Sequence, residues 1–451
     1  MLSRCSAHRR IRAAEAIAAD GPFGNPAAGG TRDMSDYDSI DFFTDPSLVP
    51  DPYPYFDYLR SRNPVLRLPH HGVVAVTGYE EAAAVYKDTD SFSNCVALGG
   101  PFPPLPFEPA GDDINAQIDQ HREKFPMYEH MVTMDPPDHT RARSLLSRLL
   151  TPSRLKQNEE FMWRLADRQL DEFLGNGRCE FISEYSKPFA TLVIADLLGV
   201  PEDDHKEFRV MLGAERPGSR VGGLDHESVG TNPLQWLDEK FSSYIEDRRR
   251  EPRDDVLTAL ATAKYPDGST PEVIDVVRSA TFLFAAGQET TAKLLSAALQ
   301  VLVERPDIQE RLREDRSLIP SFIEESLRLE SPVKSDSRLA RRSTTVAGVD
   351  IPAGTVVVVL PGPSTATRAG STIRTSFAWT ERTFANTWPL PEGSTPAPAH
   401  RLPASRAVFR SSASSTGWPT SPSTRPDTGR QAIAAIAMNR PISCAASPNY
   451  T

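Results

Sequence analysis

A stretch of 34 residues without proline, 272–305, most constrains how this chain can fold. Thr270 can cap a helix there, Pro271 suits its first turn, and Glu272 complements the positive end of the helix dipole. A helix of this length would extend about 50 Å. Because residues 280–283 and 292–302 are almost entirely apolar, we expect this helix to run through the interior of the protein.

The centre of this helix carries an unusual group of residues, Ala286-Gly287-Gln288-Glu289-Thr290-Thr291. A glycine, a carboxylate and two hydroxyls interrupt an apolar helix here, and burying them costs free energy unless they are paired or used. The sequence therefore predicts either a functional site at this point or a solvated patch on one face of the helix.

Other segments are also mainly helical. Helices are predicted over 151–175, closed by Gly175, and over 187–198, ending before Gly199 and Pro201. Strand signals are few, at 72–78, 344–349 and 354–360, with residues 349–354 predicted to form the hairpin turn between the last two. We expect a mainly α fold with a small β portion.

Composition excludes several classes of protein. The net charge of −10 argues against a nucleic-acid partner, because phosphate binding needs clustered positive charge. The four cysteines are widely separated, which argues against a structural zinc site or a disulfide framework. No apolar run approaches the roughly 20 residues that a membrane span needs, so no membrane association is expected.

The two ends of the chain differ from its middle. Residues 1–33 are Arg-rich and acid-poor like a transit peptide, but we expect a disordered or mis-called extension, because Met34 could be a second start. Residues 363–451 hold 3 acidic residues and 9 arginines, with no lysine, and are dense in Ser, Thr, Pro and Ala. This composition predicts a disordered tail. The predicted domain is therefore 34–362.

Two further motifs carry candidate functional residues. Glu325 and Arg328 lie one helical turn apart in an E-x-x-R segment, about 35 residues after the helix centre and followed by Ser331-Pro332. In the segment 134–143, His139 and Arg143 are four residues apart and so point to one side of a helix. A planar guanidinium suits a carboxylate ligand. A charged surface turn is the alternative for this segment, and it fits Arg141 better than Arg143.

In their order and spacing, these motifs resemble those of the cytochrome P-450 family. The resemblance implies that Ala286 and Gly287 let the long helix pass over the face of a haem b, that Thr290 hydrogen-bonds dioxygen, and that Glu289 serves proton delivery. It also implies that Glu325 and Arg328 form a buried pair. His139, Arg143 and Arg338 would hold the haem propionates.

The resemblance also implies an activity and partners. The expected enzyme inserts one oxygen atom from O2 into a small hydrophobic organic substrate. Its electrons would come from NAD(P)H through a ferredoxin and a ferredoxin reductase. The lack of an apolar span fits the soluble bacterial class, so a cytoplasmic monomer is expected.

The C-terminal quarter departs from the family pattern, because neither its meander nor its haem-cysteine motif follows Gly362. Cys444 lacks the flanking Phe and Gly, so no metal ligand is assigned in this chain. Read in another frame, residues 363–371 can encode V-D-R-N-P-R-R-F and residues 388–399 can encode A-F-A-R-G-V-H-T-C-P-G. We therefore predict that the tail is out of frame from about residue 363, with the cysteine codon straddling Pro396 and Ala397.

This departure leads to two expectations. The chain as written should be inactive and give no thiolate-type carbon-monoxide spectrum. The alternative is a non-catalytic haem- or ligand-binding relative with a genuine tail. A variant that uses peroxide or performs a dehydration is a third option, against which the Glu289–Thr290 pair argues.

Overall fold

The structure is a computed structural model that describes residues 34–146, 152–176, 178–213, 234–360 and 443–444. It separates into two units, Met1–Asp45 and Pro46–Thr451. In the first unit, the described part contains the 3-10 helix η2, Met34–Ser39. The predicted extension 1–33 lies outside the described residues, as does the predicted tail 363–451 apart from residues 443–444.

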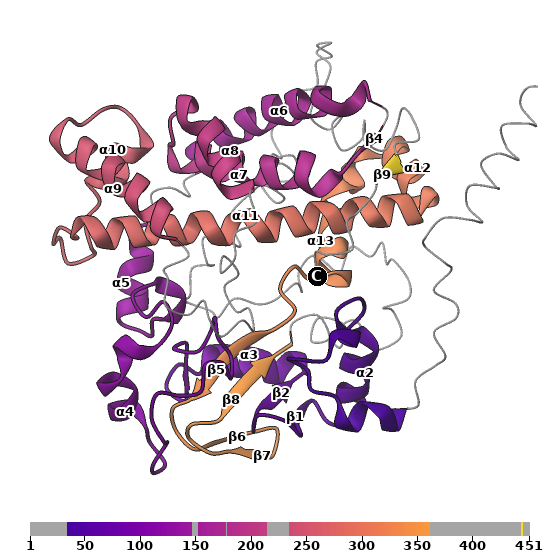
Figure 1. Ribbon diagram of the computed structural model, residues 1–451, viewed down its shortest axis with the longest axis vertical. Helices are drawn as coiled ribbons and strands as arrows, with labels where there is room; N and C mark the ends of the chain where they lie inside the picture. The colour runs from indigo at the N-terminus through magenta and orange to yellow at the C-terminus, as the bar shows by residue number, and fades with distance from the viewer. Residues whose placement is uncertain (1–33, 147–151, 177, 214–233, 361–442, 445–451) are drawn as a thin grey trace, which may run out of the picture. The chain divides into compact units, whose positions relative to one another are not determined.

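Helices dominate the second unit, which confirms the predicted fold class (Figure 1). Short 3-10 turns and the π-helix η7 (Ile182–Ser186) connect them. The α-helices are α2 Tyr53–Arg62, α3 Tyr79–Lys87, α4 Asn115–Gln120, α5 Asp138–Ser144, α6 Pro152–Leu174, α7 Lys187–Leu198, α8 His205–Gly213, α9 Gln235–Arg250, α10 Val256–Ala261, α11 Val273–Glu304, α12 Pro306–Glu314 and α13 Ile319–Leu329.

Helix α11 is the long helix expected from the sequence, and it packs against α7 and α9 (Figure 1). Its predicted start was too early, because the N-cap is Glu272 rather than Thr270. The side chain of Asp275 accepts a hydrogen bond from the Glu272 backbone N–H at 3.3 Å, closing a capping box. The hydroxyl of Thr270 instead accepts from Lys264.

Three apolar clusters surround α11. Its first half, with Val277, Leu283 and Phe284, packs among buried residues of α7, α9 and α10. Leu295 joins a cluster formed mainly by α6 and α7. Its last turns, with Leu294 and Leu302, pack against α12 and α13. The helix is therefore the shared wall of three cores, as expected for a long helix with apolar residues on several faces.

The other predicted helices also form. Helix α6 begins at Pro152 and ends just before Gly175, and α7 has the bounds predicted from the sequence. Gly199 ends α7 in the left-handed conformation, with φ of +80°, which a side chain would strain. A Cβ at Gly199 would also meet Val256 at 2.9 Å, so the glycine allows α10 to approach the end of α7 closely.

The main sheet has the strand order β1-β2-β8-β5-β3. Strands β2 and β8 run parallel and are buried along their whole length, whereas the other neighbouring pairs are antiparallel. The strands of this sheet are β1 Val65–Arg67, β2 Val74–Val76, β3 Phe92–Ser93, β5 Asp336–Ala340 and β8 Val356–Val359.

The predicted hairpin turn at 349–354 is wrong in position. Strands β6 (Thr344–Val346) and β7 (Val349–Ile351) pair with each other, and the turn between them is Ala347-Gly348. Both turn residues have positive φ, 48° and 79°, as a two-residue hairpin of the tight type requires. Strand β8 then joins the main sheet beside β2 and β5 instead of pairing with β7.

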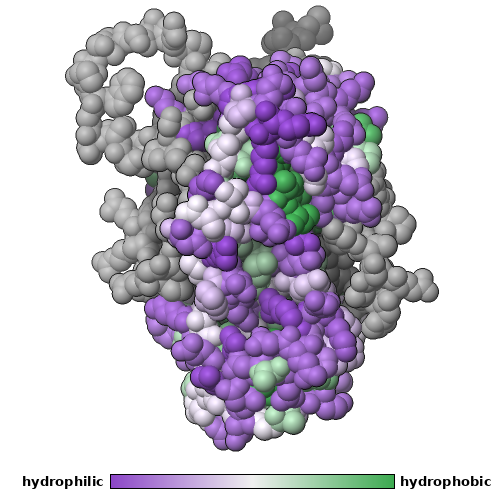
Figure 2. All heavy atoms as spheres, turned by 90° about the vertical axis from the view of Figure 1, so that its left-hand side faces the viewer, coloured by the Kyte–Doolittle hydropathy of each residue, from purple (hydrophilic) through white to green (hydrophobic). Residues whose placement is uncertain are grey.

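Among the helices that the structure describes, none is long and apolar enough to cross a membrane. The face in Figure 2 is mostly hydrophilic, with apolar side chains confined to small groups. Small separate groups of this kind are ordinary on a protein surface and mark no interaction site by themselves.

Candidate functional site

The E-x-x-R segment forms a buried ion pair in α13. Arg328 donates two hydrogen bonds to the Glu325 carboxylate, from Nε to Oε2 at 2.8 Å and from Nη2 to Oε1 at 2.7 Å. Glu325 is 1% exposed and Arg328 is 6% exposed. The buried pair that the family resemblance implies therefore forms, with the planar bidentate geometry that guanidinium groups favour. The family's further partner of this pair, an arginine of the meander, belongs to a segment that does not follow Gly362 in this chain.

The centre of α11 is only partly buried. Gly287 is buried, and Ala286 and Thr290 are partly buried, but the side chain of Glu289 is 70% exposed. Its carboxylate lies 2.8 Å from Lys293 Nζ, one turn along the helix. Lys293 and solvent thus satisfy this carboxylate on an open side of the helix, as the alternative of a solvated patch describes.

Thr290 and Gln288 use their polar groups within the helix layer. The Thr290 hydroxyl donates to the Ala286 carbonyl at 2.8 Å, the local bond that a threonine makes inside a helix. Gln288 reaches the other way and donates from Nε2 to Thr191 Oγ1 of α7 at 2.8 Å. Gln288 therefore links the centre of α11 to α7, whereas the Thr290 hydroxyl bonds only within α11 in these contacts.

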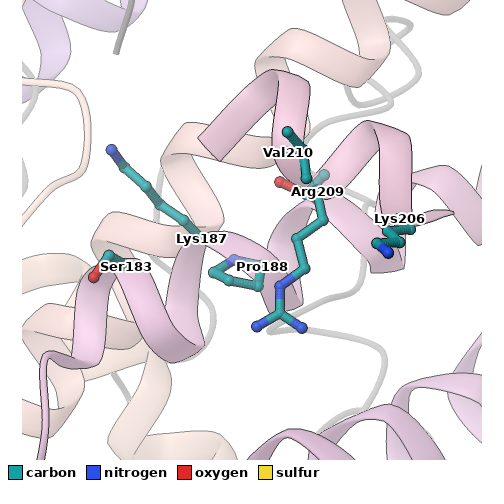
Figure 3. Close-up of a pocket in the computed structure, with 7 residues that line it drawn as sticks. Ser183, Lys187, Pro188, Lys206, Arg209 and Val210 are labelled. Atoms are coloured by element: carbon teal, nitrogen blue, oxygen red, sulfur yellow. The ribbon is translucent and has the colours of Figure 1, made fainter. Parts of the chain in front are cut away.

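A cavity of about 590 Å³ lies next to this attachment, between the start of α7 and α8 (Figure 3). Thr191 lines it together with Lys187, Lys206 and Arg209. Arg209 makes a bidentate contact to Glu172, with oxygens at 3.1 and 2.8 Å. The lining of the cavity is mainly apolar, with these three cationic side chains among it.

Helix α5 presents the two predicted propionate ligands on its less exposed side. His139 and Arg143 are partly buried, whereas Arg141 is exposed. The Arg141 guanidinium lies 4.0 Å from the centre of the Tyr265 ring. This division agrees with the sequence argument that a surface role fits Arg141 better than Arg143.

Arg338, the third predicted propionate ligand, belongs to the sheet, and its charge acts on His139 of α5. It lies in β5, opposite Val357 of β8, and its side chain is 15% exposed. The guanidinium stacks over the Tyr86 ring at 4.8 Å and donates to Asp336 Oδ1 at 2.9 Å. Such stacking and pairing hold a planar cation in one orientation.

The three groups act on one another electrostatically. Burial lowers the pKa of His139, and the charges of Arg143 and Arg338 lower it further, while Asp135 raises it. Residues almost 200 positions apart in sequence therefore converge, and we call His139, Arg143 and Arg338 the cationic cluster. A dianionic group would relieve the repulsion within it, which is what two porphyrin propionates supply. The residues present thus fit the propionate side of a haem.

The described cysteines do not fit the iron side. Cys95 and Cys179 are both buried, and burial raises the pKa of the Cys95 thiol to about 12. Metal ligation requires the thiolate, which this environment disfavours. The backbone of Cys444, in β9 (Ser443–Cys444), pairs with Cys179 in β4 (Arg178–Cys179). No group of three or more metal-ligating side chains gathers within the described part of the chain.

One element of the site was missed from the sequence. Asp135 precedes α5, and its carboxylate accepts hydrogen bonds from Ser93 and Asn94. The sequence did carry a signal for this role: Asp135 stands directly before Pro136-Pro137 and the start of a helix, and a carboxylate beside a rigid turn often anchors the backbone. Its partners could not be found this way, because they come from a strand about 40 residues earlier.

Comparisons with known proteins identify the family. Residues 225–364 match the family model described as cytochrome P-450. A solved cytochrome P-450 of Mycobacterium marinum, in its substrate-free form, is 72% identical, covers 83% of this chain and 88% of its own, and superposes with a TM-score of 0.75. A vitamin D(3) 25-hydroxylase of Pseudonocardia autotrophica is 32% identical over 68% of this chain and 72% of its own.

Cytochrome P-450 144 of Mycobacterium tuberculosis is 30% identical over 70% of both chains. The chain belongs to the cytochrome P-450 family of haem monooxygenases.

Proposed function

We propose that the protein inserts one oxygen atom from O2 into a small hydrophobic organic substrate, with electrons from NAD(P)H delivered through a ferredoxin and its reductase. The observation that carries this proposal is the cationic cluster, whose members come from α5 and β5 and influence one another's charge. Haem, when bound, supplies the chemistry of dioxygen activation and oxygen transfer.

The cluster would hold the two propionates, with Arg143 and Arg338 as permanent cations and His139 as a hydrogen-bond donor. Its members are partly buried, so their bonds to carboxylates would be stronger than in open water. Gly287, without a side chain, leaves space beside α11 for a flat ligand. The Glu325–Arg328 pair would stabilise the α13 side of the same region.

Thr290 and Glu289 would move protons to the reacting oxygen. The Thr290 hydroxyl can exchange its present acceptor, the Ala286 carbonyl, for a ligand without breaking the helix, because that carbonyl keeps its second lone pair for the helical bond. Glu289 on the exposed side could take up protons from solvent through its contact with Lys293. The relay would therefore run from solvent to Glu289 and then to Thr290.

One relative bears on the substrate class. The name of the Pseudonocardia relative describes hydroxylation of vitamin D(3), an apolar molecule, which is compatible with a hydrophobic substrate. A monomer in the cytoplasm remains part of the proposal.

We further propose that the chain as written is inactive, because no cysteine in its sequence has the flanking residues of the family's thiolate ligand. The out-of-frame reading of residues from about 363 supplies that motif, so a single inserted or lost base would account for its absence. A non-catalytic haem-binding relative with a genuine tail is the second candidate, favoured by the same missing cysteine and the intact cationic cluster.

The test is to resequence the gene across the codons for residues 355–400 and to express both readings. If a base is gained or lost, the corrected protein should give a thiolate-type carbon-monoxide difference spectrum and oxygenate substrates with reduced ferredoxin. If the sequence stands, the chain should bind haem without that spectrum, which favours the second candidate. A thiolate spectrum from the chain as written would overturn the proposed inactivity.

A further inference from the structure

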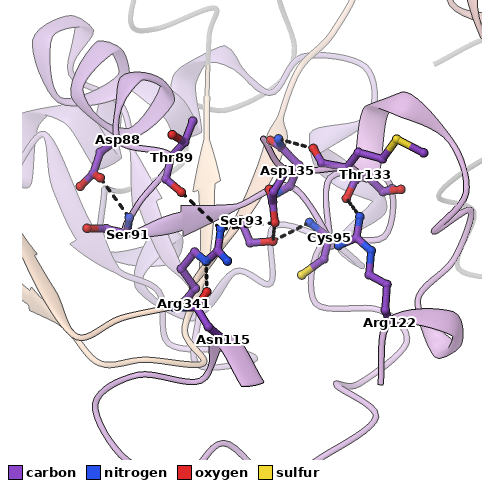
Figure 4. A network of polar contacts seen from close by, with 12 residues as sticks. Asp88, Thr89, Ser91, Ser93, Cys95, Asn115, Arg122, Thr133, Asp135 and Arg341 are labelled. Atoms are coloured by element: carbon purple, nitrogen blue, oxygen red, sulfur yellow. Dashed lines mark hydrogen bonds and ion pairs between the residues drawn. The ribbon is translucent and has the colours of Figure 1, made fainter. Parts of the chain in front are cut away.

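The carboxylate of Asp135, just N-terminal to α5, is the centre of a polar network (Figure 4). Ser93 Oγ donates to Oδ2 at 2.5 Å and the Asn94 backbone N–H donates to Oδ1 at 2.7 Å. Arg341 Nη1 lies 3.6 Å from Oδ2. Ser93 is fully buried and the Asp135 side chain is only 13% exposed, so these bonds are shielded from water.

All three partners belong to the sheet that carries Arg338. Ser93 ends β3 and pairs with Leu339, the residue after Arg338 in β5. Arg341 directly follows β5, and its backbone N–H donates to the Ser91 carbonyl at 2.8 Å. Its Nε also donates to Asn115 (Figure 4). Through these bonds Asp135 is fixed to the strand pair β3–β5.

The backbone of Asp135 is bonded to α5, the helix that carries His139 and Arg143 of the cationic cluster. Its carbonyl accepts the His139 backbone N–H at 3.0 Å, the first bond of the turn that starts α5. The Asn94 side-chain amide donates to the Met134 carbonyl at 2.8 Å, which holds the same loop from one residue earlier. Asp135 therefore joins the strand of Arg338 to the helix of His139 and Arg143.

This joint opposes a definite force. Arg143 and Arg338 carry like charges, and both lower the pKa of His139. Asp336 pairs with Arg338 at 2.9 Å and so offsets part of the repulsion between the two arginines. The spacing between α5 and β5 must nevertheless match the separation of two propionates on a rigid ring, since a misplaced donor forms a much weaker hydrogen bond.

We propose that Asp135 is a positioning residue that fixes the spacing between α5 and β5, so that the cationic cluster is set to receive a porphyrin dicarboxylate before it binds. This inference rests on the proposed function, because it assumes that the cluster holds propionates. It assigns no direct contact between Asp135 and the ligand. It requires that loss of the Asp135 network weaken the binding of a porphyrin with free carboxylates more than the binding of its ester.

The test measures binding of two metal-free probes, protoporphyrin IX and its dimethyl ester, to the full chain by quenching of tryptophan fluorescence. Neither probe needs an axial cysteine, and only the first carries free carboxylates. Two variants loosen the joint: Asp135→Asn removes its charge, and Ser93→Ala removes one donor while every charge remains. Asp307→Asn is the matched control, because Asp307 forms a 2.7 Å ion pair with Arg305 at the start of α12, apart from the residues of the Asp135 network.

We expect both variants to weaken protoporphyrin IX binding, Asp135→Asn by about ten-fold, as when a supporting hydrogen bond is lost behind a metal ligand. Binding of the dimethyl ester and all values for Asp307→Asn should stay unchanged. Equal weakening of both probes would show a merely structural role and overturn the inference. No weakening of either probe by either variant would also overturn it. If Asp135→Asn does not fold, Ser93→Ala alone decides.

Failure of the proposed function has a different signature. If the unaltered chain binds the dimethyl ester as tightly as protoporphyrin IX, the cationic cluster does not hold propionates, and the inference falls with it. If the unaltered chain prefers protoporphyrin IX and the variants keep that preference, the cluster stands and only the role of Asp135 is overturned.

Discussion

Two carboxylate–cation pairs, one in α13 and one in α11, occur at nearly the same helical spacing and differ almost completely in environment. Glu325 and Arg328 are three residues apart, with side chains 2% and 5% exposed, and share two hydrogen bonds. Glu289 and Lys293 are four residues apart, 70% and 50% exposed, and share one 2.8 Å contact. Spacing brought both pairs together, but the neighbouring helices decided which of them water can reach.

The difference has an energetic consequence. An exposed pair gains little, because water competes for both charges, and about 0.2–1 kcal/mol is typical. A buried pair has lost that water, so removing one partner leaves an uncompensated charge in the interior. The α13 pair is therefore a structural requirement, whereas the α11 pair leaves its carboxylate free to exchange protons with solvent.

The largest expected effect comes from Glu325→Gln. The neutral amide leaves the Arg328 charge buried without its carboxylate, which should cost about 3–5 kcal/mol of unfolding free energy. Urea unfolding followed by circular dichroism measures this loss. The double variant Glu325→Leu with Arg328→Met removes both charges and should recover part of it. A loss below about 1 kcal/mol would mean that the Glu325–Arg328 pair stabilises the protein no more than the exposed Glu289–Lys293 pair does.

A buried group without a charged partner at hydrogen-bond distance extends the comparison. His130, just before η5 (Met131–Thr133), is 4% exposed, and no hydrogen bond to either ring nitrogen is found among the described residues. Burial lowers its pKa, as does the charge of Arg278, while Asp238 and Glu129 raise it. In the unfolded chain the pKa returns towards 6.5, so the unfolded state binds the proton more readily.

The sign follows directly: the stability associated with neutral His130 is present above pH 6.5 and falls as the pH decreases through that value. Unfolding free energies measured at a series of pH values from neutral downward should therefore decrease, and His130→Phe should make the decrease shallower. His139, whose pKa burial also lowers, should account for part of the remainder. An unchanged slope in His130→Phe would mean that His130 is hydrated in solution.

How far the sequence predicts such differences can be seen at particular residues. The bounds of α7 and the existence of α11 follow from local signals, namely periodicity and caps, whereas the buried Glu325–Arg328 pair was implied by the family resemblance. The exposure of Glu289 does not follow from local signals, because it depends on which helices cover that side of α11. The start of α11 was misplaced for a local reason, since Thr270 and Glu272 both make acceptable caps and Asp275 decided between them.

The cationic cluster shows the same limit at long range. His139 and Arg143 could be assigned to one helix face from their spacing, and Arg338 could be named only through the family resemblance. Their convergence, and the network of Asp135 that joins them, depend on the pairing of β3 with β5, which no local pattern indicated. Residues that meet across a sheet edge are specified by tertiary register, which propensity does not encode.

A smaller effect is expected at Thr290, in the same stretch of α11 as Glu289. Thr290→Ala removes a hydrogen bond to the Ala286 carbonyl, but alanine is the better helix former, so the unfolding free energy should change by less than about 0.5 kcal/mol. Turnover by the frame-corrected enzyme should nevertheless fall if Thr290 delivers protons, and Thr290→Ser should retain it. A loss of stability comparable with that of Glu325→Gln would show that Thr290 is a packing residue instead.

The smallest effect should come from Glu289→Gln. The contact with Lys293 is exposed at both ends, so the unfolding free energy should fall by about 0.5 kcal/mol or less in dilute buffer. Because salt screens exposed charges, the difference from the unaltered chain should vanish at about 1 M NaCl. Lys293→Gln should have a similar effect, and the double variant should lose little more than either single one. A loss that persists at high salt would place the Glu289 carboxylate in a dry environment like that of Glu325, and the contrast between the two helices would then disappear.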